Sequence, residues 1–359
     1  MVAAVRRGAP GSAEPRAPHM AAVAQHRYGG PEVLALEEVL APAAGAGEVL
    51  IRVAAAAVSA GDVLVMRGEP RLVRLAFGVR RPKRPTIGRD VSGEVVAVGD
   101  GVTRFRVGEA VFAESDQGGW AELVAVPERF VAHRPGSVDA AHAAAVPVSG
   151  TTALQGLRLA GVRAGSRVLV NGASGGVGGF AVQLAVALGA HVTGVSRGAK
   201  AAHVHALGAD RVIDYRTTDF TRQTAAYDVV FDLVGDRPLG AVRRTLAPGG
   251  TLLLASGRGG RVLGPMRRIL AAGLISPFVP QRLRILTARR NGDDLAELAR
   301  RIDSGEIRPV VDEVVPLERV ADAVRRLEAG DVRGKLVLAI GRPASPRSAA
   351  RSADGGTRP

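Results

Sequence analysis

The residues best suited to chemistry form a glycine-rich turn between an apolar strand and a helix. The run from Val168 to Gly178 contains the spacing Ala173-x-Gly175-x-x-Gly178. In such a turn Gly175 lets the backbone approach a pyrophosphate, Gly178 lets the helix pack closely on the strand, and the helix N-terminus offers free N–H groups to the anion. Because the pattern lies inside a βαβ unit, it predicts dinucleotide binding rather than a loop without a ligand. The predicted contacts are Ala173, Ser174, Gly175, Gly176, Val177 and Gly178.

The residues after the next strand indicate which dinucleotide is bound. Proteins that bind NADH usually place Asp or Glu there, where it accepts a hydrogen bond from the ribose 2′-hydroxyl. This chain has Ser196 and Arg197 instead, with Lys200 just beyond and no acid. A carboxylate would repel the 2′-phosphate of NADPH, whereas Arg and Lys attract it. Together with Tyr215, a hydroxyl donor that closes the third strand, this pattern favours NADPH over NADH.

The elements that must position these residues change in character along the chain. Residues 20–146 read as short strands and turns. From 147 to 294, apolar strands alternate with helices, which predicts an α/β fold with a doubly wound parallel sheet. Residues 1–19 and 342–359 are rich in Pro, Gly, Ala, Ser and Arg without apolar periodicity, so we expect both to be disordered. We expect Met20 to be the natural start.

The composition restricts the possible chemistry. The 359 residues suggest two domains, and 47% are hydrophobic, which is enough for sizeable cores. There is no cysteine, which removes disulfides, thiolate nucleophiles and Cys-ligated zinc, and fits a reducing, cytoplasmic location. The net charge of +14 favours anionic ligands. However, the sequence has no RNA-binding motif and no interleaved aromatics, so we expect no nucleic-acid partner.

Six further segments stand out beside the glycine turn. They are Tyr28-Gly-Gly-Pro-Glu-Val-Leu, Pro85-Thr-Ile-Gly-Arg-Asp-Val-Ser-Gly-Glu-Val, Val107-Gly-Glu-Ala-Val-Phe, Ala144-Ala-Val-Pro-Val-Ser-Gly-Thr-Thr-Ala-Leu, Leu207-Gly-Ala-Asp-Arg-Val-Ile-Asp-Tyr and Gly334-Lys-Leu-Val-Leu. Over about residues 20–341 the chain resembles the zinc-free quinone oxidoreductase branch of the medium-chain dehydrogenase/reductase superfamily. The resemblance implies a GroES-like substrate domain over 20–146, rejoined by 295–341, and a Rossmann NADPH-binding domain over 147–294. It also implies a homodimer.

The resemblance assigns expected roles to further residues. Thr152 matches a threonine near the nicotinamide, and Lys200 and Tyr215 match contacts to the 2′-phosphate. Ser256 and Gly257 match the loop that holds the carboxamide. Ser59 and Asp62 fall where the family has polar residues near the substrate, so we expect Ser59, Asp62 or Thr152 to provide polar contacts for catalysis.

The chain departs from the family at the positions that bind metal. Zinc-dependent members carry a catalytic Cys where Ser59 falls and a His-Glu pair where Arg89 and Asp90 stand. Their four-cysteine lobe is replaced here by a short loop, so we expect neither zinc site. The usual active-site tyrosine is replaced by Leu64, which leaves the proton donor undefined.

These features predict an NADPH-dependent enzyme that transfers hydride to a quinone or an α,β-unsaturated carbonyl without a metal. Such electron-poor acceptors need positioning more than Lewis-acid help. Two alternatives are an enoyl-thioester reductase, which shares the fold and the hydride chemistry, and a non-catalytic NADPH-binding protein.

Two basic and apolar segments are distinctive. Residues 71–84 carry six cations and no acid, and residues 258–290 carry eight cations and no acid. One interpretation is an apolar lid that makes weak peripheral contact with an anionic membrane. The other is an interface helix with solvated arginines, which is the more common role of such charge runs.

Overall fold

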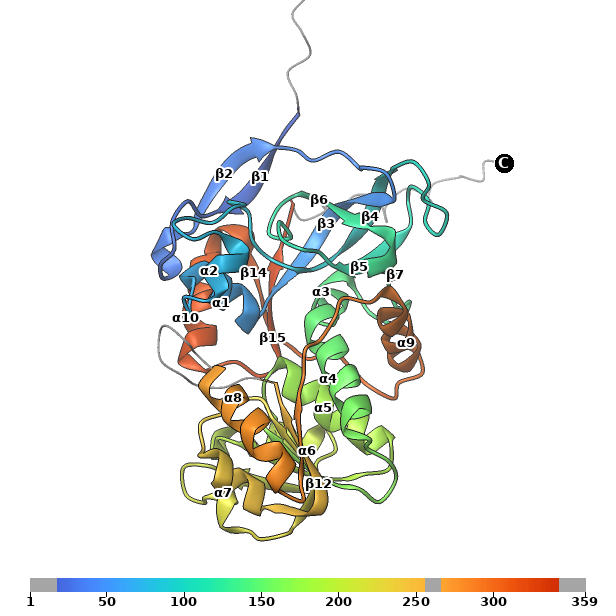
Figure 1. Cartoon of the computed structure of the whole chain (residues 1–359). Coiled ribbons are helices and arrows are strands. Elements are labelled where there is room, and N and C mark those ends of the chain that lie inside the picture. Colours follow the sequence, from blue (N-terminus) through green and yellow to red (C-terminus); the bar gives the residue numbers. More distant parts are fainter. Residues whose placement is uncertain (1–17, 256–265, 342–359) are drawn as a thin grey trace, which may run out of the picture.

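The computed structural model describes residues 18–255 and 266–341, and its parallel sheet is covered by helices on both faces (Figure 1). A six-stranded sheet with the order β10-β9-β8-β11-β12-β13 is parallel throughout. Its strands are β8 (Arg167–Asn171), β9 (His191–Ser196), β10 (Arg211–Asp214), β11 (Tyr227–Asp232), β12 (Leu246–Leu254) and β13 (Arg282–Ile285). Because the order reverses beside β8, the loops at its carboxyl end form the switch point at which doubly wound sheets bind ligands.

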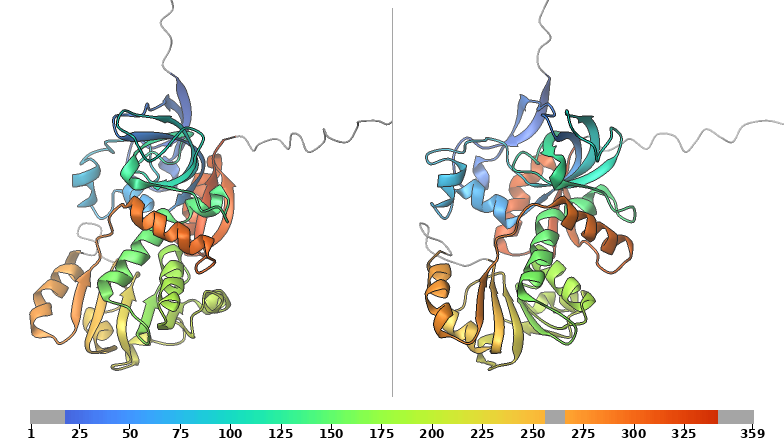
Figure 2. Two further views of the ribbon diagram at one scale, coloured as in Figure 1. Left: turned by 90° about the vertical axis from the view of Figure 1, so that its right-hand side faces the viewer. Right: turned by 45° about the vertical axis from the view of Figure 1, so that its right-hand side comes forward.

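The side chains of these strands alternate between two cores. Val168 and Val170 belong to the core under the helices α4 and α5, whereas Leu169 belongs to the core on the opposite face. The two layers appear on either side of the sheet in Figure 2, where α8 is orange and α4 and α5 are green. The helices of this unit are α4 (Pro147–Ala160), α5 (Gly176–Ala187), α6 (Ala201–Ala206), α7 (Leu239–Arg244) and α8 (Met266–Ile275). Burial on both faces explains the nearly continuous apolar character of the strands.

The remaining elements form a β-rich unit above the parallel sheet in Figure 1. A seven-stranded sheet has the order β14-β15-β3-β4-β5-β7, with β6 also paired to β3, and β1 and β2 form a separate pair. The strands are β1 (His19–Ala24), β2 (Ala35–Leu40), β3 (Glu48–Val58), β4 (Asp90–Val98), β5 (Ala110–Glu114), β6 (Leu123–Pro127), β7 (Val131–His133), β14 (Val311–Pro316) and β15 (Lys335–Ala339). The helices are α1 (Ala60–Arg67), α2 (Val73–Phe77), α3 (Ala140–Ala144), α9 (Gly292–Asp303) and α10 (Val320–Ala329).

The end of the described chain returns to its beginning. The strand β15 pairs antiparallel with β3, so that Leu336 lies opposite Val58 and Ala339 opposite Ala55. This pairing brings the last strand beside the first half of the chain. The domain bounds at 146/147 and 294/295 are predictions from the sequence.

The expected terminal disorder needs one correction. The strand β1 begins at His19, inside the segment 1–19, because its main chain pairs with β2 from His19 opposite Leu40 onward. Residues 1–17 and 342–359 lie outside the described residues.

Candidate functional site

The glycine turn is built as the sequence pattern requires. The N–H groups of Gly172 and Ala173 both donate to the Val195 carbonyl at 3.1 Å, which fixes the turn against β9. A Cβ on Gly178 would lie 2.1 Å from the Gly172 carbonyl oxygen, so only glycine fits there. The first turn of α5 therefore packs closely on the backbone that follows β8.

Gly175 is different, since nothing inside the chain requires a glycine there. Its φ is −86°, and a Cβ would meet only the Gly172 oxygen at 3.6 Å, an ordinary contact. The backbone at Gly175 and Gly176 is partly exposed, and the first amides of a helix have no acceptor within the helix. The Gly175 N–H donates to the Gly172 carbonyl at 3.2 Å, so the open space lies beside the helix amides that follow it, where it fits the diphosphate of a dinucleotide. The residues present therefore fit such a cofactor.

Three of the predicted adenosine-side residues lie together. The Arg197 Nε donates to the Tyr215 hydroxyl at 3.0 Å. The Lys200 ammonium follows in the next turn and donates to the Gly330 carbonyl at 2.8 Å. The fourth residue, Ser196, is buried, and its hydroxyl donates to its own neighbour's carbonyl at Arg197. The structure thus gathers two cations and a phenol at the end of β9, where a 2′-phosphate would be held.

The remaining predicted residues have different outcomes. Thr152 lies on α4, partly buried, and its hydroxyl donates to the Val148 carbonyl at 2.6 Å. That hydroxyl keeps its lone pairs, so it can still accept a hydrogen bond. Ser256 and Gly257 lie outside the described residues.

Ser59 belongs to a buried polar cluster that sequence reasoning did not identify. Its hydroxyl donates to Asp90 Oδ2 at 2.6 Å and accepts from Lys335 Nζ. The Lys335 ammonium also donates to Asp90 Oδ2 at 2.9 Å, and the other Asp90 oxygen accepts from the Val148 N–H at 2.6 Å. Asp90 therefore stabilises both the lysine and the N-terminus of α4, where a negative charge is favourable.

Lys335 also joins this cluster to the glycine turn. The Gly334 N–H donates to the Ser174 carbonyl at 2.9 Å, and a Cβ on Gly176 would lie 2.7 Å from the Lys335 side-chain Cδ. The aliphatic part of the lysine thus packs beneath the first residue of α5. The Lys335 side chain is only 4% exposed, so its charge depends on Asp90 for compensation.

Asp62 caps the helix that follows Ser59. Its carboxylate accepts from the Ser59 main-chain N–H at 2.8 Å, and burial raises the pKa of Asp62 to about 6 although Arg89 opposes the shift. The distance from Arg89 Nε to Asp62 Oδ1 is 3.8 Å, which is too long for a hydrogen bond. Burial likewise raises the pKa of Glu114, to about 7, with Arg89 Nη1 at 3.4 Å opposing it.

Two signals in the sequence point to these missed residues. Lysine occurs only at Lys83, Lys200 and Lys335 in a chain whose other basic residues are arginines, and two of the three lie at the candidate site. A compact ammonium fits a small buried space that the planar guanidinium does not. Arg89 and Asp90 fall where the resemblance implies a ligand pair in zinc-dependent members, which indicates their position in the site but not the residues that they contact.

A second buried carboxylate lies at the carboxyl end of β11. Asp232 is fully buried and accepts from Asn171 Nδ2 at 2.8 Å, from the Gly235 N–H at 2.9 Å and from Arg268 Nη2 at 2.6 Å. Arg268 comes from α8, so this pair fastens α8 to the switch point of the sheet. The charge of Arg268 is therefore compensated by Asp232 inside the protein and does not face a membrane surface.

Potential metal ligands do not converge in the described part of the chain. Among residues 18–255 and 266–341, no group of three or more His, Cys, Asp or Glu side chains is arranged to hold a metal ion. Ser59, which falls where the resemblance implies a catalytic Cys in zinc-dependent members, bonds to Lys335 and Asp90.

Comparison with known proteins shows the family. Residues 45–136 match the family described as alcohol dehydrogenase GroES-like domain, and residues 207–338 match the family described as zinc-binding dehydrogenase. The chain belongs to the medium-chain dehydrogenase/reductase superfamily, in the branch of the quinone and alkenal oxidoreductases. The predicted family is thereby confirmed, as is the fold class of a Rossmann sheet with a GroES-like domain.

Individual relatives cover nearly the whole chain. The NADPH-dependent alkenal/one oxidoreductase of Arabidopsis thaliana chloroplasts is 34% identical, over 87% of this chain and 77% of its own. The chloroplast envelope quinone oxidoreductase homolog of the same plant is 31% identical, over 89% and 98%. Among solved structures, Escherichia coli quinone oxidoreductase complexed with NADPH has a TM-score of 0.78 at 25% identity, over 89% and 100%.

The raised carboxyl pKa values predict how stability depends on pH. Between about pH 5 and 7 the folded Glu114 carboxyl holds a proton that the unfolded chain, with a pKa of 4.5, has lost. Its contribution to the free energy of unfolding therefore falls as the pH rises. Glutamine mimics the protonated acid at every pH. The free energy of unfolding of Glu114→Gln should therefore rise by about 2 kcal/mol relative to that of the wild type between pH 5 and pH 8. Urea unfolding at both pH values measures this gain.

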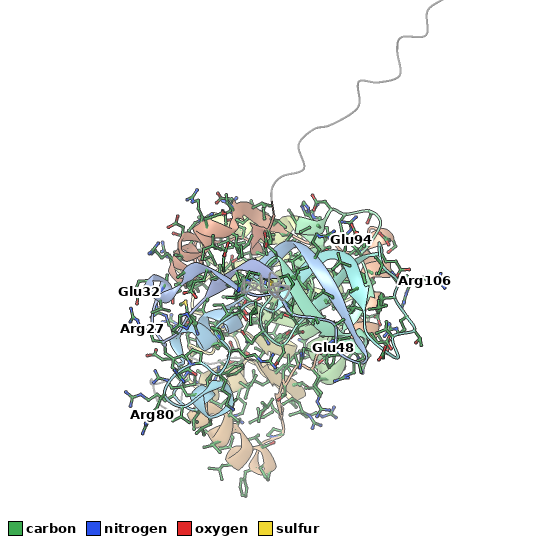
Figure 3. All side chains as sticks on the ribbon, turned by 90° about the horizontal axis from the view of Figure 1, so that it is seen from above. Arg27, Glu32, Glu48, Arg80, Glu94 and Arg106 are labelled. Atoms are coloured by element: carbon green, nitrogen blue, oxygen red, sulfur yellow. The ribbon has the colours of Figure 1, made fainter. Side chains whose placement is uncertain are left out.

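Glu94→Gln is the matched control, because Glu94 lies exposed on the surface seen in Figure 3. A difference between Glu114→Gln and the wild type that does not change with pH would contradict the assignment.

The buried ion pair predicts a second effect on stability. Lys335→Met leaves the Asp90 carboxylate buried without its cation, which should lower the free energy of unfolding by about 3–5 kcal/mol. Adding Asp90→Asn removes the stranded charge while the new amide oxygen still accepts from Val148, so most of the loss should be recovered. Urea unfolding measures both, with Lys83→Met as the exposed control. Losses that simply add in the double variant would show that the two groups do not interact.

Proposed function

We propose that this protein is an NADPH-dependent oxidoreductase that transfers hydride to a quinone or an α,β-unsaturated carbonyl without a metal. The observation that carries the proposal is the pairing of a free helix N-terminus at Gly175 with the cations Arg197 and Lys200 at the end of β9. The named activities of relatives that cover most of the chain support the same cofactor and the same substrate class.

Two groups of residues would contact opposite ends of the cofactor. The amides of Gly176 and Val177 would hold the diphosphate beside the exposed backbone of Gly175, and Arg197 with Lys200 would neutralise the 2′-phosphate. At the other end the predicted contacts are Thr152 and the loop after β12. When bound, NADPH supplies the hydride, and the protein supplies position and charge.

The Ser59 cluster would serve the substrate end. The bonds to Lys335 and Asp90 fix the Ser59 hydroxyl, while the Asp62 carboxylate fixes its main chain. A reduced quinone or enone carries a negative charge on oxygen, and the Lys335 ammonium lies one hydrogen bond away from the Ser59 oxygen. We propose that this pair stabilises the charge and holds the proton that the product takes up. The family tyrosine that Leu64 replaces would thereby be substituted by Ser59 at the N-terminus of α1 and Lys335 of β15.

Assembly and location remain proposals. A homodimer would use the outer edge of β13, whose strand pairs only with β12 on its inner side within the described residues. Unpaired strand edges readily pair with another chain, and sedimentation velocity would test this against the 37.0 kDa monomer. A cytoplasmic location rests on the absence of cysteine, and cell fractionation would test it. Among the described residues no helix is long and apolar enough to cross a membrane.

A weak contact with an anionic membrane is proposed for the segment around α2. Leu72, Leu75 and Val79 are exposed there. Arg80 points away from the body of the protein in Figure 3, and Arg71 is also exposed. Apolar side chains ringed by cations fit a surface of acidic headgroups.

The cofactor assignment predicts a selective loss of affinity. Arg197→Gln combined with Lys200→Gln removes both cations from the 2′-phosphate, so the Kd for NADPH should rise about 30-fold or more, while the Kd for NADH changes less than about threefold. Isothermal titration calorimetry measures both constants. Arg216→Gln, an exposed arginine just after β10, is the control for charge alone.

Turnover in the same preparation identifies the reaction. NADPH oxidation should be fast with quinones or enones and slower with enoyl thioesters. Faster turnover of enoyl thioesters would replace the proposed substrate class. NADPH binding without turnover on any of the three would indicate a binding protein instead.

The membrane contact predicts flotation with vesicles that contain anionic phosphatidylserine. At low salt a fraction of the protein should float with these vesicles and not with neutral phosphatidylcholine vesicles, and 0.5 M salt should release it, because exposed charges are then screened. Leu75→Ser with Val79→Ser should reduce the floating fraction several-fold. Protein that stays at the bottom of the gradient with both vesicle types would exclude the contact.

A further inference from the structure

The two cations that we assign to the 2′-phosphate are already held by one short loop. Arg197 Nη1 donates to the Asp331 carboxylate at 2.8 Å, and Nη2 donates to the Ala329 carbonyl at 3.0 Å. Lys200 Nζ donates to the carbonyls of Gly330 at 2.8 Å and Val332 at 2.6 Å. The segment 329–332, which joins α10 to β15, therefore supplies four acceptors to these two side chains.

The shape of this loop explains the arrangement. The helix α10 ends at Ala329, and Gly330 adopts a left-handed conformation with φ of 71°. The Gly330 N–H satisfies the Arg326 and Leu327 carbonyls, while the later carbonyls of Ala329 and Gly330 accept from the two cations. These contacts cap the helix, and the Lys200 bond to Val332 extends them into the loop. The Asp331 carboxylate is different, because it adds a full negative charge.

We propose that Asp331 competes with the 2′-phosphate of NADPH for Arg197 and thereby sets how strongly the protein prefers NADPH over NADH. This inference rests on the proposed function. A guanidinium binds a carboxylate and a phosphate through the same N–H groups, so the two anions exclude one another at Nη1. NADH has a neutral hydroxyl at this position and does not enter the competition.

The exposure of the pair allows the exchange. The Asp331 side chain is 66% exposed, and the Arg197 side chain is 30% exposed. Exposed ion pairs are weakly held, so the carboxylate can turn into water when a stronger anion arrives. Once displaced, it still lies beside a phosphate of the same sign and weakens its binding. Asp331 thus lowers affinity for NADPH without blocking it.

Asp331→Asn is the decisive variant, since it removes the charge and keeps the size. The Kd for NADPH should fall about three- to tenfold, while the Kd for NADH should stay within about twofold of the wild type. Isothermal titration calorimetry at low salt measures both, and the gain should shrink at 0.5 M salt because the effect is electrostatic. Asp331 is exposed in this loop, so its substitution does not put folding at risk.

Two further variants isolate the interaction. Asp322→Asn removes the same charge from α10, but Asp322 pairs with Arg319 and Arg325 rather than with Arg197, so it should leave both constants unchanged. In an Arg197→Gln background the effect of Asp331→Asn should shrink to less than about twofold, because the competition for Arg197 is gone and only the screened repulsion between Asp331 and the phosphate is left.

The outcomes are distinct. An unchanged or higher Kd for NADPH in Asp331→Asn, with the wild type still preferring NADPH, overturns the competition and leaves the proposed function intact. An equal gain from Asp322→Asn also overturns it, because net charge then explains the effect. A wild-type protein that binds neither nucleotide overturns the proposed function and this inference with it.

Discussion

The buried pair of Lys335 and Asp90 is the interaction on which the rest of the site depends. A lysine that is only 4% exposed would lose its charge or destabilise the fold without a compensating anion. Asp90 supplies that anion and uses its other oxygen to cap α4. Strands β3, β4 and β15 and the first turn of α4 are thus fixed around two charges. The position of the Ser59 hydroxyl is a consequence of this arrangement.

The same lysine makes the nucleotide turn and the polar cluster one assembly. Its main chain follows Gly334, which bonds to Ser174 in the turn, and its stem packs beneath Gly176. A shift of the glycine turn would therefore displace Lys335, and a shift of Lys335 would displace the turn. Four residues earlier, Asp331 accepts a hydrogen bond from Arg197, which is assigned to the 2′-phosphate. One short stretch of chain, from 331 to 335, thus contacts the groups assigned to the 2′-phosphate and to the diphosphate.

Sequence reasoning succeeded where the cause of the structure is local. The alternation of apolar strands and helices predicted the parallel sheet, and the glycine turn predicted the helix that opens there, which is α5 from Gly176. It failed where a partner comes from far along the chain. Lys335 and Asp90 are 245 positions apart, and no spacing rule relates them. The basic run 258–290 reads as surface charge, yet Arg268 is buried by its pair with Asp232.

The pairing of β15 with β3 has a consequence for synthesis on the ribosome. Lys335 and Ser59 are 276 positions apart, so a nascent chain waits on the order of tens of seconds between making the two. Throughout that time the β3 edge from Ala55 to Val58 has no partner on one side. The parallel sheet is complete well before, since β13 ends at Ile285. The strands of the parallel sheet are therefore all made while the β-rich unit still lacks β15. During this interval a chaperone that covers strand edges would protect the nascent chain.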